Sequence, residues 1–370
     1  MTTREIRIDR SRPLTAQPES GHNRWHPDIP PLLECDSGDE VVLETRDALD
    51  GQLAPDVTLA QVAQADLGVV HPLTGPVYVA GAEPGDLLEV DILEVAPEPF
   101  GFTSQIPGFG FLADIFAEPF LARWQIDGGF ATSGDLLGVR IPGAPFMGTI
   151  GLSPGHDLLR RTLAREQAAL DAGGAVLMPD PAGAVPGTGA IAAEALRTIP
   201  PREQGGNVDI RHLVAGTRLF LPVDTPGALF SAGDAHFAQG DSEACGTAIE
   251  MAATLRVRFA VHSGAAAARG IRSPRFSRSG SPSPAATTEP ARYIATTGMP
   301  LTEEGENRAG DLTLAARNAL LAMIDELTER GFSRPQAYAI CSVAVDLTLS
   351  QLVDVPNVLV SAFLPLDIFD

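Results

Sequence analysis

The chain has 370 residues, of which 44% are hydrophobic and 20% are charged, so it can bury a sizeable core and is not globally disordered. Its net charge of −21 disfavours binding to nucleic acid or to an anionic membrane surface. The sequence contains no lysine, which excludes Schiff-base chemistry, Ser–Lys or Cys–Lys relays and a P-loop phosphate site.

The predicted elements are mostly short strands. The 37 glycines and 31 prolines separate short apolar runs, a pattern that is typical of strands and turns. In chain order, we expect strands at residues 40–45, 77–80, 87–93, 218–223 and 254–261. We therefore predict a mainly β protein, a sandwich or barrel of many short strands, with a small α/β unit at its C-terminal end.

Four departures from this pattern set the predicted organisation. Residues 1–263 form the β-rich catalytic body, in which the glycine- and phenylalanine-rich residues 99–130 are an irregular insertion that either packs on the core or covers a small-molecule pocket. A helix is expected near 156–171, ending at two glycines. Residues 264–290, rich in Ala, Ser, Pro and Arg, are an exposed connection, and 291–370 form the small α/β unit.

The densest group of polar side chains follows an apolar run that ends near residue 230. Asp234 and His236 are two residues apart, as are Asp241 and Glu243, and residues at that spacing share a face of an extended chain. Gly240 can turn the chain so that both pairs converge. Such side chains could bind zinc or another divalent ion, with one carboxylate acting as general base, or could form a hydrogen-bonded turn.

Two other stretches could contribute to the same site. Asn207 and Asp209 follow two glycines at the same spacing, and Asp47 follows the end of a predicted strand. Asn207 could instead brace a loop, and Asp47 could instead form a turn. Near the N-terminus, Trp25 and His26 belong either to a binding loop in which Trp25 forms an apolar wall, or to a structured arm.

The three cysteines are widely spaced, which implies no disulfide framework and indicates a reducing compartment. Cys245 lies two residues after Glu243 and is either a nucleophile with Glu243 as its base or a buried thiol. No apolar run reaches the roughly 18 residues that a membrane-spanning helix needs. We expect a cytoplasmic protein that does not bind a membrane.

Several runs together resemble the acetamidase/formamidase family, and they follow one another in order along essentially the whole chain. They are residues 22–31 (HNRWHPDIPP), 75–86 (GPVYVAGAEPGD), 205–210 (GGNVDI), 233–236 with 240–243 (GDAH and GDSE), and the tail 346–369. The N-terminal run and the region 99–130 are closer to the formamidase branch. Ser242 departs from the family, in which many members have glycine at that position.

The resemblance implies an amidohydrolase that splits formamide into formate and ammonia, a homo-oligomer such as a dimer or trimer, and a divalent metal of the zinc type. Carried over by motif, the metal ligands would be Asp47, Asp209, Asp234 and His236, and the catalytic residues would be Asp241, Glu243 and His236. Asn207, Trp25 and His26 are the candidates for substrate binding. Hydrolysis of an amide needs an activated nucleophile, stabilisation of the carbonyl oxygen and an acid for ammonia, and a metal-activated water with a carboxylate supplies the first two without lysine.

Other interpretations stay open at this point. Within the family, acetamide or a small cyclic amide could be the substrate, and Cys245 could be the nucleophile. A different class would be a non-catalytic β-sandwich that binds carbohydrate or a metal, in which the acidic cluster holds a structural calcium.

Overall fold

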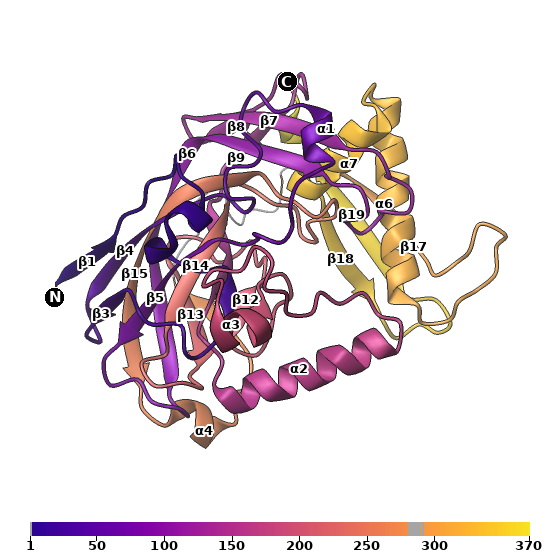
Figure 1. Ribbon diagram of the computed structural model, residues 1–370. Coiled ribbons are helices and arrows are strands. Elements are labelled where there is room, and N and C mark those ends of the chain that lie inside the picture. Colours follow the sequence, from indigo (N-terminus) through magenta and orange to yellow (C-terminus); the bar gives the residue numbers. More distant parts are fainter. Residues whose placement is uncertain (1, 280–289, 291) are drawn as a thin grey trace.

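The computed structural model describes residues 2–279, 290 and 292–370, and strands dominate these parts of the chain (Figure 1). The strands are β1 Thr3–Ile6, β2 Arg24–Trp25, β3 Leu33–Cys35, β4 Glu40–Thr45, β5 Leu73–Val79, β6 Leu87–Gln105, β7 Phe120–Asp127, β8 Phe130–Thr132, β9 Arg140–Pro142, β10 Phe146–Gly151, β11 Leu196–Arg197, β12 Gly205–Asn207, β13 Thr217–Pro222, β14 Phe230–His236, β15 Glu250–His262, β16 Arg275–Arg278, β17 Tyr293–Gly298, β18 Asp346–Gln351 and β19 Leu359–Pro365. The α-helices are α1 Leu59–Val62, α2 His156–Asp171, α3 Gly189–Glu194, α4 Ala265–Arg269, α6 Leu312–Glu329 and α7 Arg334–Ala344, and short 3-10 turns lie at Leu14–Ala16, Pro18–Ser20 and Leu366–Ile368. The prediction of a mainly β protein is confirmed.

Fourteen of these strands are joined by hydrogen bonds into one branched sheet. Its main path runs β12-β10-β14-β15-β6-β7-β8-β9, and among the described residues this path does not close into a barrel. β6 and β15 form its longest antiparallel pair, with Phe102 opposite Glu250 at one end and Leu87 opposite His262 at the other. Along β15, buried side chains alternate with more exposed ones, as the sequence predicted for residues 254–261.

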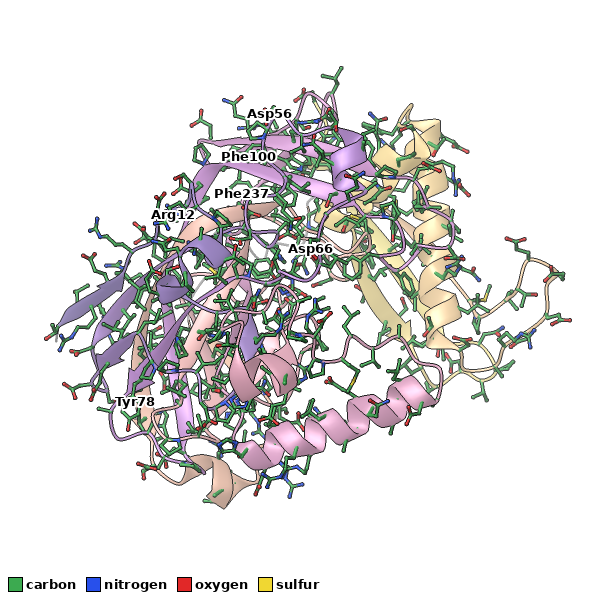
Figure 2. All side chains as sticks on the ribbon, viewed as in Figure 1. Arg12, Asp56, Asp66, Tyr78, Phe100 and Phe237 are labelled. Carbon is green, nitrogen blue, oxygen red and sulfur yellow. The ribbon has the colours of Figure 1, made fainter. Side chains whose placement is uncertain are left out.

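The C-terminal part forms a separate three-stranded sheet, β17-β19-β18, with α6 and α7 beside it (Figure 1). Asp311 begins α6 by accepting a hydrogen bond from Leu314 N at 2.9 Å, and Ser333 begins α7 with a capping box. One hydrophobic cluster includes Phe230 of β14 and Met251 of β15 in the large sheet, Phe237 directly after β14, and Leu320 of α6. Figure 2 shows Phe237 inside this body. The secondary structure therefore changes between the β-rich body and the C-terminal unit, but one hydrophobic core continues through both.

Residues 99–130, predicted as an irregular insertion, contain the end of β6 and the whole of β7. Within this range, residues 106–119 and the turn 128–129 between β7 and β8 lie outside the strands. The glycines misled the prediction because one of them serves close packing between strands: a Cβ on Gly101 would lie 2.8 Å from the carbonyl oxygen of Glu250. Gly101 pairs with Trp124 of β7 and with Met251 of β15, so this glycine belongs to the sheet.

The predicted exposed connection 264–290 also differs in its first half. Residues 265–269 form α4, and β16 pairs antiparallel with β13, with Phe276 opposite Leu219. Residues 280–289 of the connection lie outside the described residues. The predicted helix near 156–171 coincides with α2.

Three neighbouring strands and one loop position the polar residues of interest. β10 lies between β12 and β14, with Thr149 opposite Asn207 on one side and Gly233 on the other. The loop between β14 and β15 is held by the end of α7, because Gly240 N donates to Ser342 O at 2.9 Å and Cys245 N donates to Ser342 Oγ at 3.0 Å. None of the helices in the described parts of the chain is long and apolar enough to cross a membrane.

Candidate active site

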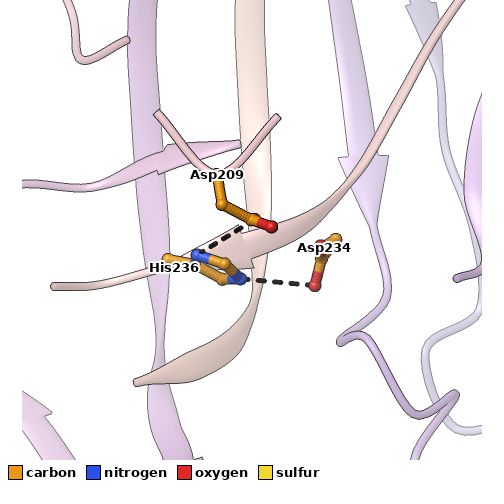
Figure 3. Close-up of side chains that lie close together, drawn as sticks. All are labelled: Asp209, Asp234 and His236. Carbon is orange, nitrogen blue, oxygen red and sulfur yellow. Dashed lines mark hydrogen bonds and ion pairs between the residues drawn. The ribbon is translucent and has the colours of Figure 1, made fainter. Parts of the chain in front are cut away.

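Five side chains that could bind a metal gather where β12, β14 and β15 approach one another. Asp234 and His236 lie on β14, Asp209 follows β12, Glu243 lies in the loop after β14, and Glu250 begins β15. Their ligand atoms form two groups that share His236: Asp209, Asp234 and His236 in one, and His236, Glu243 and Glu250 in the other, each within 4.8 Å. Figure 3 shows the first group around the imidazole ring.

The Nε2 atom of His236 faces three carboxylates. It lies 3.2 Å from Glu250 Oε2, 3.3 Å from Asp234 Oδ1 and 3.9 Å from Glu243 Oε1. The side chains of His236, Asp234 and Glu250 are each at most 3% exposed, whereas Glu243 is 15% exposed. Glu243 is therefore on the more open side of this group.

The other ring nitrogen of His236 has a different partner. Nδ1 lies 2.8 Å from Gln239 Oε1, and the orientation of that amide is fixed because Gln239 Nε2 donates to the carbonyl oxygen of Asp209 at 2.9 Å. Nδ1 must therefore donate its hydrogen to Gln239. Nε2 is left either to carry a second proton toward the carboxylates or to bind a cation, and a metal-binding histidine usually donates its other N–H in this way.

Burial and mutual charge shift the pKa values of the whole group. Burial, reinforced by Asp234, raises the pKa of Asp209 to about 7 and that of Glu250 to about 7. Burial and Asp209 raise the pKa of Glu243 well above its ordinary value. Burial alone would lower the pKa of His236, but Glu250 and Asp234 outweigh it and raise that pKa well above its ordinary value. Four carboxylates held so closely with one imidazole form a site that attracts positive charge.

Three of the acidic residues have backbones in the left-handed region. The φ angles are 45° at Asp209, 57° at Asp234 and 49° at Glu243. Such a conformation costs about 1–3 kcal/mol at a residue other than glycine, and it persists where the surrounding structure imposes it. Asp234, two residues before His236, thus reaches that ring from a left-handed backbone conformation.

The site provides space for an ion beside Gly148 of β10. A Cβ at this position would lie 2.5 Å from Asp209 Oδ1, 2.7 Å from His236 Cε1 and 2.9 Å from Asp234 Oδ2. The buried oxygens Asp209 Oδ1 and Glu250 Oε2 have no hydrogen-bond partner among the described residues. Oxygen and imidazole donors around a small cradle fit a divalent cation of the zinc or manganese type.

Two further side chains surround Asp234. The hydroxyl oxygen of Thr149 lies 3.0 Å from Asp234 Oδ2 and 2.8 Å from Asn207 Oδ1, so its single proton can serve one of them at a time. His71 Nε2 lies 3.9 Å from Asp234 Oδ2. Burial acts against the charge of Asp234, but His71 and His236 outweigh it and lower the pKa of this carboxyl. Asp234 is therefore the carboxylate of the group that stays ionised most readily.

The structure does not bring two of the predicted acidic residues into either ligand group. Asp47 accepts hydrogen bonds from Leu49 N at 3.0 Å and from Gly51 N at 3.0 Å, which is its alternative role as a turn former. Burial raises the pKa of Asp47, and the charge of Asp234 adds a smaller contribution in the same direction. The backbone N–H of Asp241 donates to Asp346 at 3.1 Å, and neither ligand group includes its carboxylate. Of the pair Asp241 and Glu243, only Glu243 lies near His236, after a backbone turn at residues 242–243.

The three predicted substrate-binding residues are held by other contacts. Asn207 is near the site, but its amide is used by Thr149 and by the carbonyl oxygen of Ile199, which Nδ2 reaches at 3.0 Å. Trp25 is 1% exposed and packs with Leu73, Leu159 and Leu196, so it does not form the wall of an open pocket. His26 Nε2 lies 3.2 Å from Glu194. This arrangement agrees with the alternative interpretation of a structured N-terminal arm.

Cys245 is completely buried, and its sulfur contacts the carbonyl oxygens of Thr247 at 3.6 Å and Ser104 at 3.7 Å. Burial raises the pKa of this thiol, which disfavours the reactive thiolate. All three cysteines are buried and free. The geometry gives no support to Cys245 as a nucleophile.

Sequence reasoning missed Glu250, Gln239, Thr149 and Gly148, all of which contribute to the site. A signal was available for Glu250, because it is a single carboxylate inside the apolar run Ala248–Ala253. Gln239 lies within the polar cluster that drew attention to His236. Thr149 and Gly148 carry no such local signal, since their importance depends on the pairing of β10 with β14.

The chain is similar to known proteins along nearly its whole length. The model of the Acetamidase/Formamidase family matches residues 7–370. An acetamidase of Mycolicibacterium smegmatis is 36% identical over 90% of this chain and 87% of its own length, and a formamidase of Methylophilus methylotrophus is 35% identical over 99% and 93%. The solved structure of a gamma lactamase from Delftia acidovorans superimposes with a TM-score of 0.93 at 36% identity, covering 100% of this chain and 94% of that one. The chain therefore belongs to the acetamidase/formamidase family and is an amide hydrolase.

Proposed function

We propose that this protein hydrolyses small, uncharged linear amides, with formamide and water giving formate and ammonia. The relatives named formamidase and acetamidase support this substrate class. The observation that carries the proposal is the commitment of His236 Nδ1 to Gln239, which leaves Nε2 and the surrounding carboxylate oxygens for a divalent cation. Bound there, such an ion would polarise the amide carbonyl and make a neighbouring water more acidic.

The residues that would hold the cation are Asp209, Asp234 and His236, with Glu250 close to the same ring nitrogen. We assign the proton transfers to Glu243. Its Oε1 lies at the more exposed edge of the group, 3.9 Å from His236 Nε2, where it can take a proton from the attacking water. Because its pKa is raised, it can hold this proton and pass it to the departing nitrogen. Thr149 and Gln239 keep Asp234 and His236 in place during these steps.

The charge and burial of the site favour small neutral substrates. Four carboxylates and one imidazole surround the reacting position, and a divalent cation would not neutralise all of them. Most of these side chains are buried, and we infer from this that the space for a substrate beside them is narrow. We infer that formamide fits best and that acetamide follows. The similarity to a gamma lactamase makes a small cyclic amide the second candidate substrate.

The remaining assignments are also proposals. Mixed oxygen and nitrogen donors suit zinc, and an additional structural calcium would require oxygen donors alone. We propose a homo-oligomer, a dimer or trimer, that acts in the cytoplasm without nucleic-acid or membrane partners. The three free buried cysteines support a reducing compartment.

Metal removal tests the mechanism. The purified protein is assayed for ammonia release from formamide and acetamide, and for formation of 4-aminobutanoate from 2-pyrrolidinone, before and after treatment with a chelator, while its metal content is measured. We expect formamide hydrolysis to disappear with the metal and to return when zinc is added. Full activity in a metal-free preparation would overturn the metal-dependent mechanism. Cys245→Ala is the control variant, because only a cysteine nucleophile requires that thiol.

A further inference from the structure

One histidine beside the acidic cluster has no role in the mechanism proposed above. His71 precedes β5, and its Nε2 atom lies 3.9 Å from Asp234 Oδ2. The side chain of His71 is 12% exposed, which is close to the 15% of Glu243. A polar side chain that is next to the reacting position and still accessible can contact a substrate there.

The backbone around His71 is fixed against the strand that carries Asp234. The backbone N–H of His71 donates to Thr198 Oγ1 at 2.5 Å. A Cβ on Gly233 would overlap with the carbonyl oxygen of Pro72, so the residue after His71 packs directly on the residue before Asp234. The imidazole ring is therefore held beside Asp234 before any substrate arrives.

The two ring nitrogens of His71 have different surroundings. Nδ1 is buried and has no hydrogen-bond partner among the described residues, so a hydrogen on Nδ1 would be a buried donor without an acceptor. Nε2 is not sealed from solvent in this way, and it faces a carboxylate at a distance that is too long for a hydrogen bond. The hydrogen of the neutral ring is therefore on Nε2, and a protonated ring would carry one there as well.

This unused donor faces the carboxylate oxygen that also borders the cradle beside Gly148. A Cβ on Gly148 would lie 2.9 Å from Asp234 Oδ2, which is the oxygen that His71 Nε2 faces. His236 approaches the other oxygen of Asp234, Oδ1, at 3.3 Å. A carbonyl oxygen that enters beside the cradle can therefore accept a hydrogen bond from His71 without breaking an existing one.

We propose that His71 is a further catalytic residue, whose Nε2–H donates a hydrogen bond to the carbonyl oxygen of the substrate. This inference rests on the amide hydrolysis proposed above. Attack of water on the carbonyl carbon moves negative charge onto this oxygen, so the hydrogen bond becomes stronger in the transition state. His71 gives up no proton in this step, and the proton transfers stay with Glu243.

Exchange of the carbonyl oxygen for sulfur tests this contact, because sulfur is a weaker hydrogen-bond acceptor. The consumption of acetamide and of thioacetamide is followed by proton NMR, and the metal content of each variant is measured. In His71→Leu we expect kcat to fall at least about 10²-fold for acetamide but less than about tenfold for thioacetamide. His71→Gln, whose amide N–H can replace Nε2–H, should recover at least about tenfold of the loss for acetamide.

Binding provides a readout that does not depend on turnover. Saturation-transfer NMR measures the apparent Kd of acetamide for the metal-depleted protein, and we expect this Kd to rise about three- to tenfold in His71→Leu, as for the loss of one hydrogen bond. His262→Leu is the matched control, since this exposed histidine pairs with Glu89 at the opposite end of β15 from Glu250. It should keep both the preference for oxygen over sulfur and the Kd.

The outcomes for His71 and for the proposed function can be told apart. An unchanged protein that hydrolyses no small amide at any metal content contradicts the proposed function, and the Kd for acetamide still decides whether His71 binds the carbonyl. If His71→Leu does not fold, His71→Asn takes its place, because its shorter amide does not reach the position of Nε2. Equal losses for acetamide and thioacetamide, an unchanged Kd, or loss of the metal in both His71→Leu and His71→Gln would each overturn the assignment.

Discussion

Two buried histidines of this protein have opposite properties. His22 and His236 are each 1% exposed. His22 Nδ1 donates to the carbonyl oxygen of Arg24 at 2.5 Å, and its Nε2 lies 2.8 Å from Ser231 Oγ on β14, so the ring is satisfied as a neutral imidazole. Burial lowers the pKa of His22 to about 4, whereas the carboxylates around His236 raise its pKa well above the ordinary value. Burial alone thus keeps the ring of His22 neutral, as suits a structural residue. The carboxylates around His236 favour a positive charge there, which makes that ring a candidate metal ligand.

The surroundings of His22 show what the N-terminal motif does. Asn23 Nδ2 donates to Gly183 O at 2.7 Å, and its Oδ1 accepts from Val185 N at 2.7 Å. The buried guanidinium of Arg24 donates to several backbone carbonyl oxygens, including that of Asp180 at 3.0 Å. This run therefore fastens the segment 180–185 to the sheet, and the acidic cluster on β14 is the place where chemistry can occur.

Replacing each of the two histidines by glutamine is expected to give the largest difference in activity. His236→Gln removes the nitrogen that faces the carboxylates, so we expect the metal to be lost and kcat for formamide to fall at least about 10²-fold, as for the loss of a catalytic electrostatic group. His22→Gln can keep hydrogen bonds to Arg24 and Ser231, and we expect it to retain metal and activity. Metal content and kcat are measured for both variants, with circular dichroism as a check of folding.

Asp234→Asn gives an independent measurement of the same effect. It preserves the size of the side chain but removes the charge next to His236, and we expect a loss of kcat of the same order. Turnover close to that of the unchanged protein in both Asp234→Asn and His236→Gln would show that these two side chains of β14 take no part in the mechanism.

A smaller effect is expected when the ligands stay and only their space is filled. In Gly148→Ala, the added methyl group would occupy the cradle between Asp209, His236 and Asp234, so we expect metal affinity and kcat/KM to fall about 10- to 100-fold. Gly134→Ala is the matched control, since a Cβ there meets no atom within 4 Å. Metal content equal in the two variants would show that the ion does not lie beside β10.

The pH dependence of stability tests whether His22 is neutral in the folded protein. Its pKa is lower in the folded protein than in the unfolded chain, so below pH 6.5 the unfolded chain takes up a proton that the folded protein does not. His22 therefore destabilises the fold progressively from about pH 6.5 down to about pH 4, by about 3 kcal/mol in total.

Thermal unfolding between pH 7 and pH 4 measures this effect as the difference between the unchanged protein and His22→Gln. The variant lacks the titrating ring, so its Tm should fall less steeply with acidification. Parallel Tm curves would show that His22 takes up a proton as readily in the folded protein as in the unfolded chain, which contradicts its assignment as a neutral structural residue.

Local patterns predicted the parts of this fold that depend on nearby residues. The alternation in β4 and the apolar face of α2 lie within single segments, and both elements occur where they were expected. Asp234 and His236 are close in the chain, so one turn of backbone suffices to join them. The N-terminal motif was recognisable, but recognition alone could not distinguish residues that hold the fold from residues that hold a substrate.

Local patterns could not predict contacts between residues that meet only because two strands pair in a particular register. Glu250 reaches His236 because these two residues are opposite each other in the pairing of β14 with β15, a contact set by the whole sheet. Thr149 reaches Asp234 through the pairing of β10 with β14. Asp47 shows the converse: its carboxylate is drawn into a local turn by the backbone N–H groups of Leu49 and Gly51, a competition that a motif does not reveal.

The smallest effect is expected at a third histidine, His26, which the sequence placed in the substrate site. It is buried like His22, but its Nε2 lies 3.2 Å from Glu194 and its Nδ1 accepts a hydrogen bond from Asp28 N at 3.1 Å. Glutamine can offer similar contacts, so His26→Gln should leave kcat/KM for formamide within about twofold and lower the stability by about 1 kcal/mol. These partners lie at the surface, so losing them should cost little. A tenfold loss of kcat/KM with unchanged Tm would instead show that His26 contacts the substrate, and that the N-terminal arm takes part in catalysis.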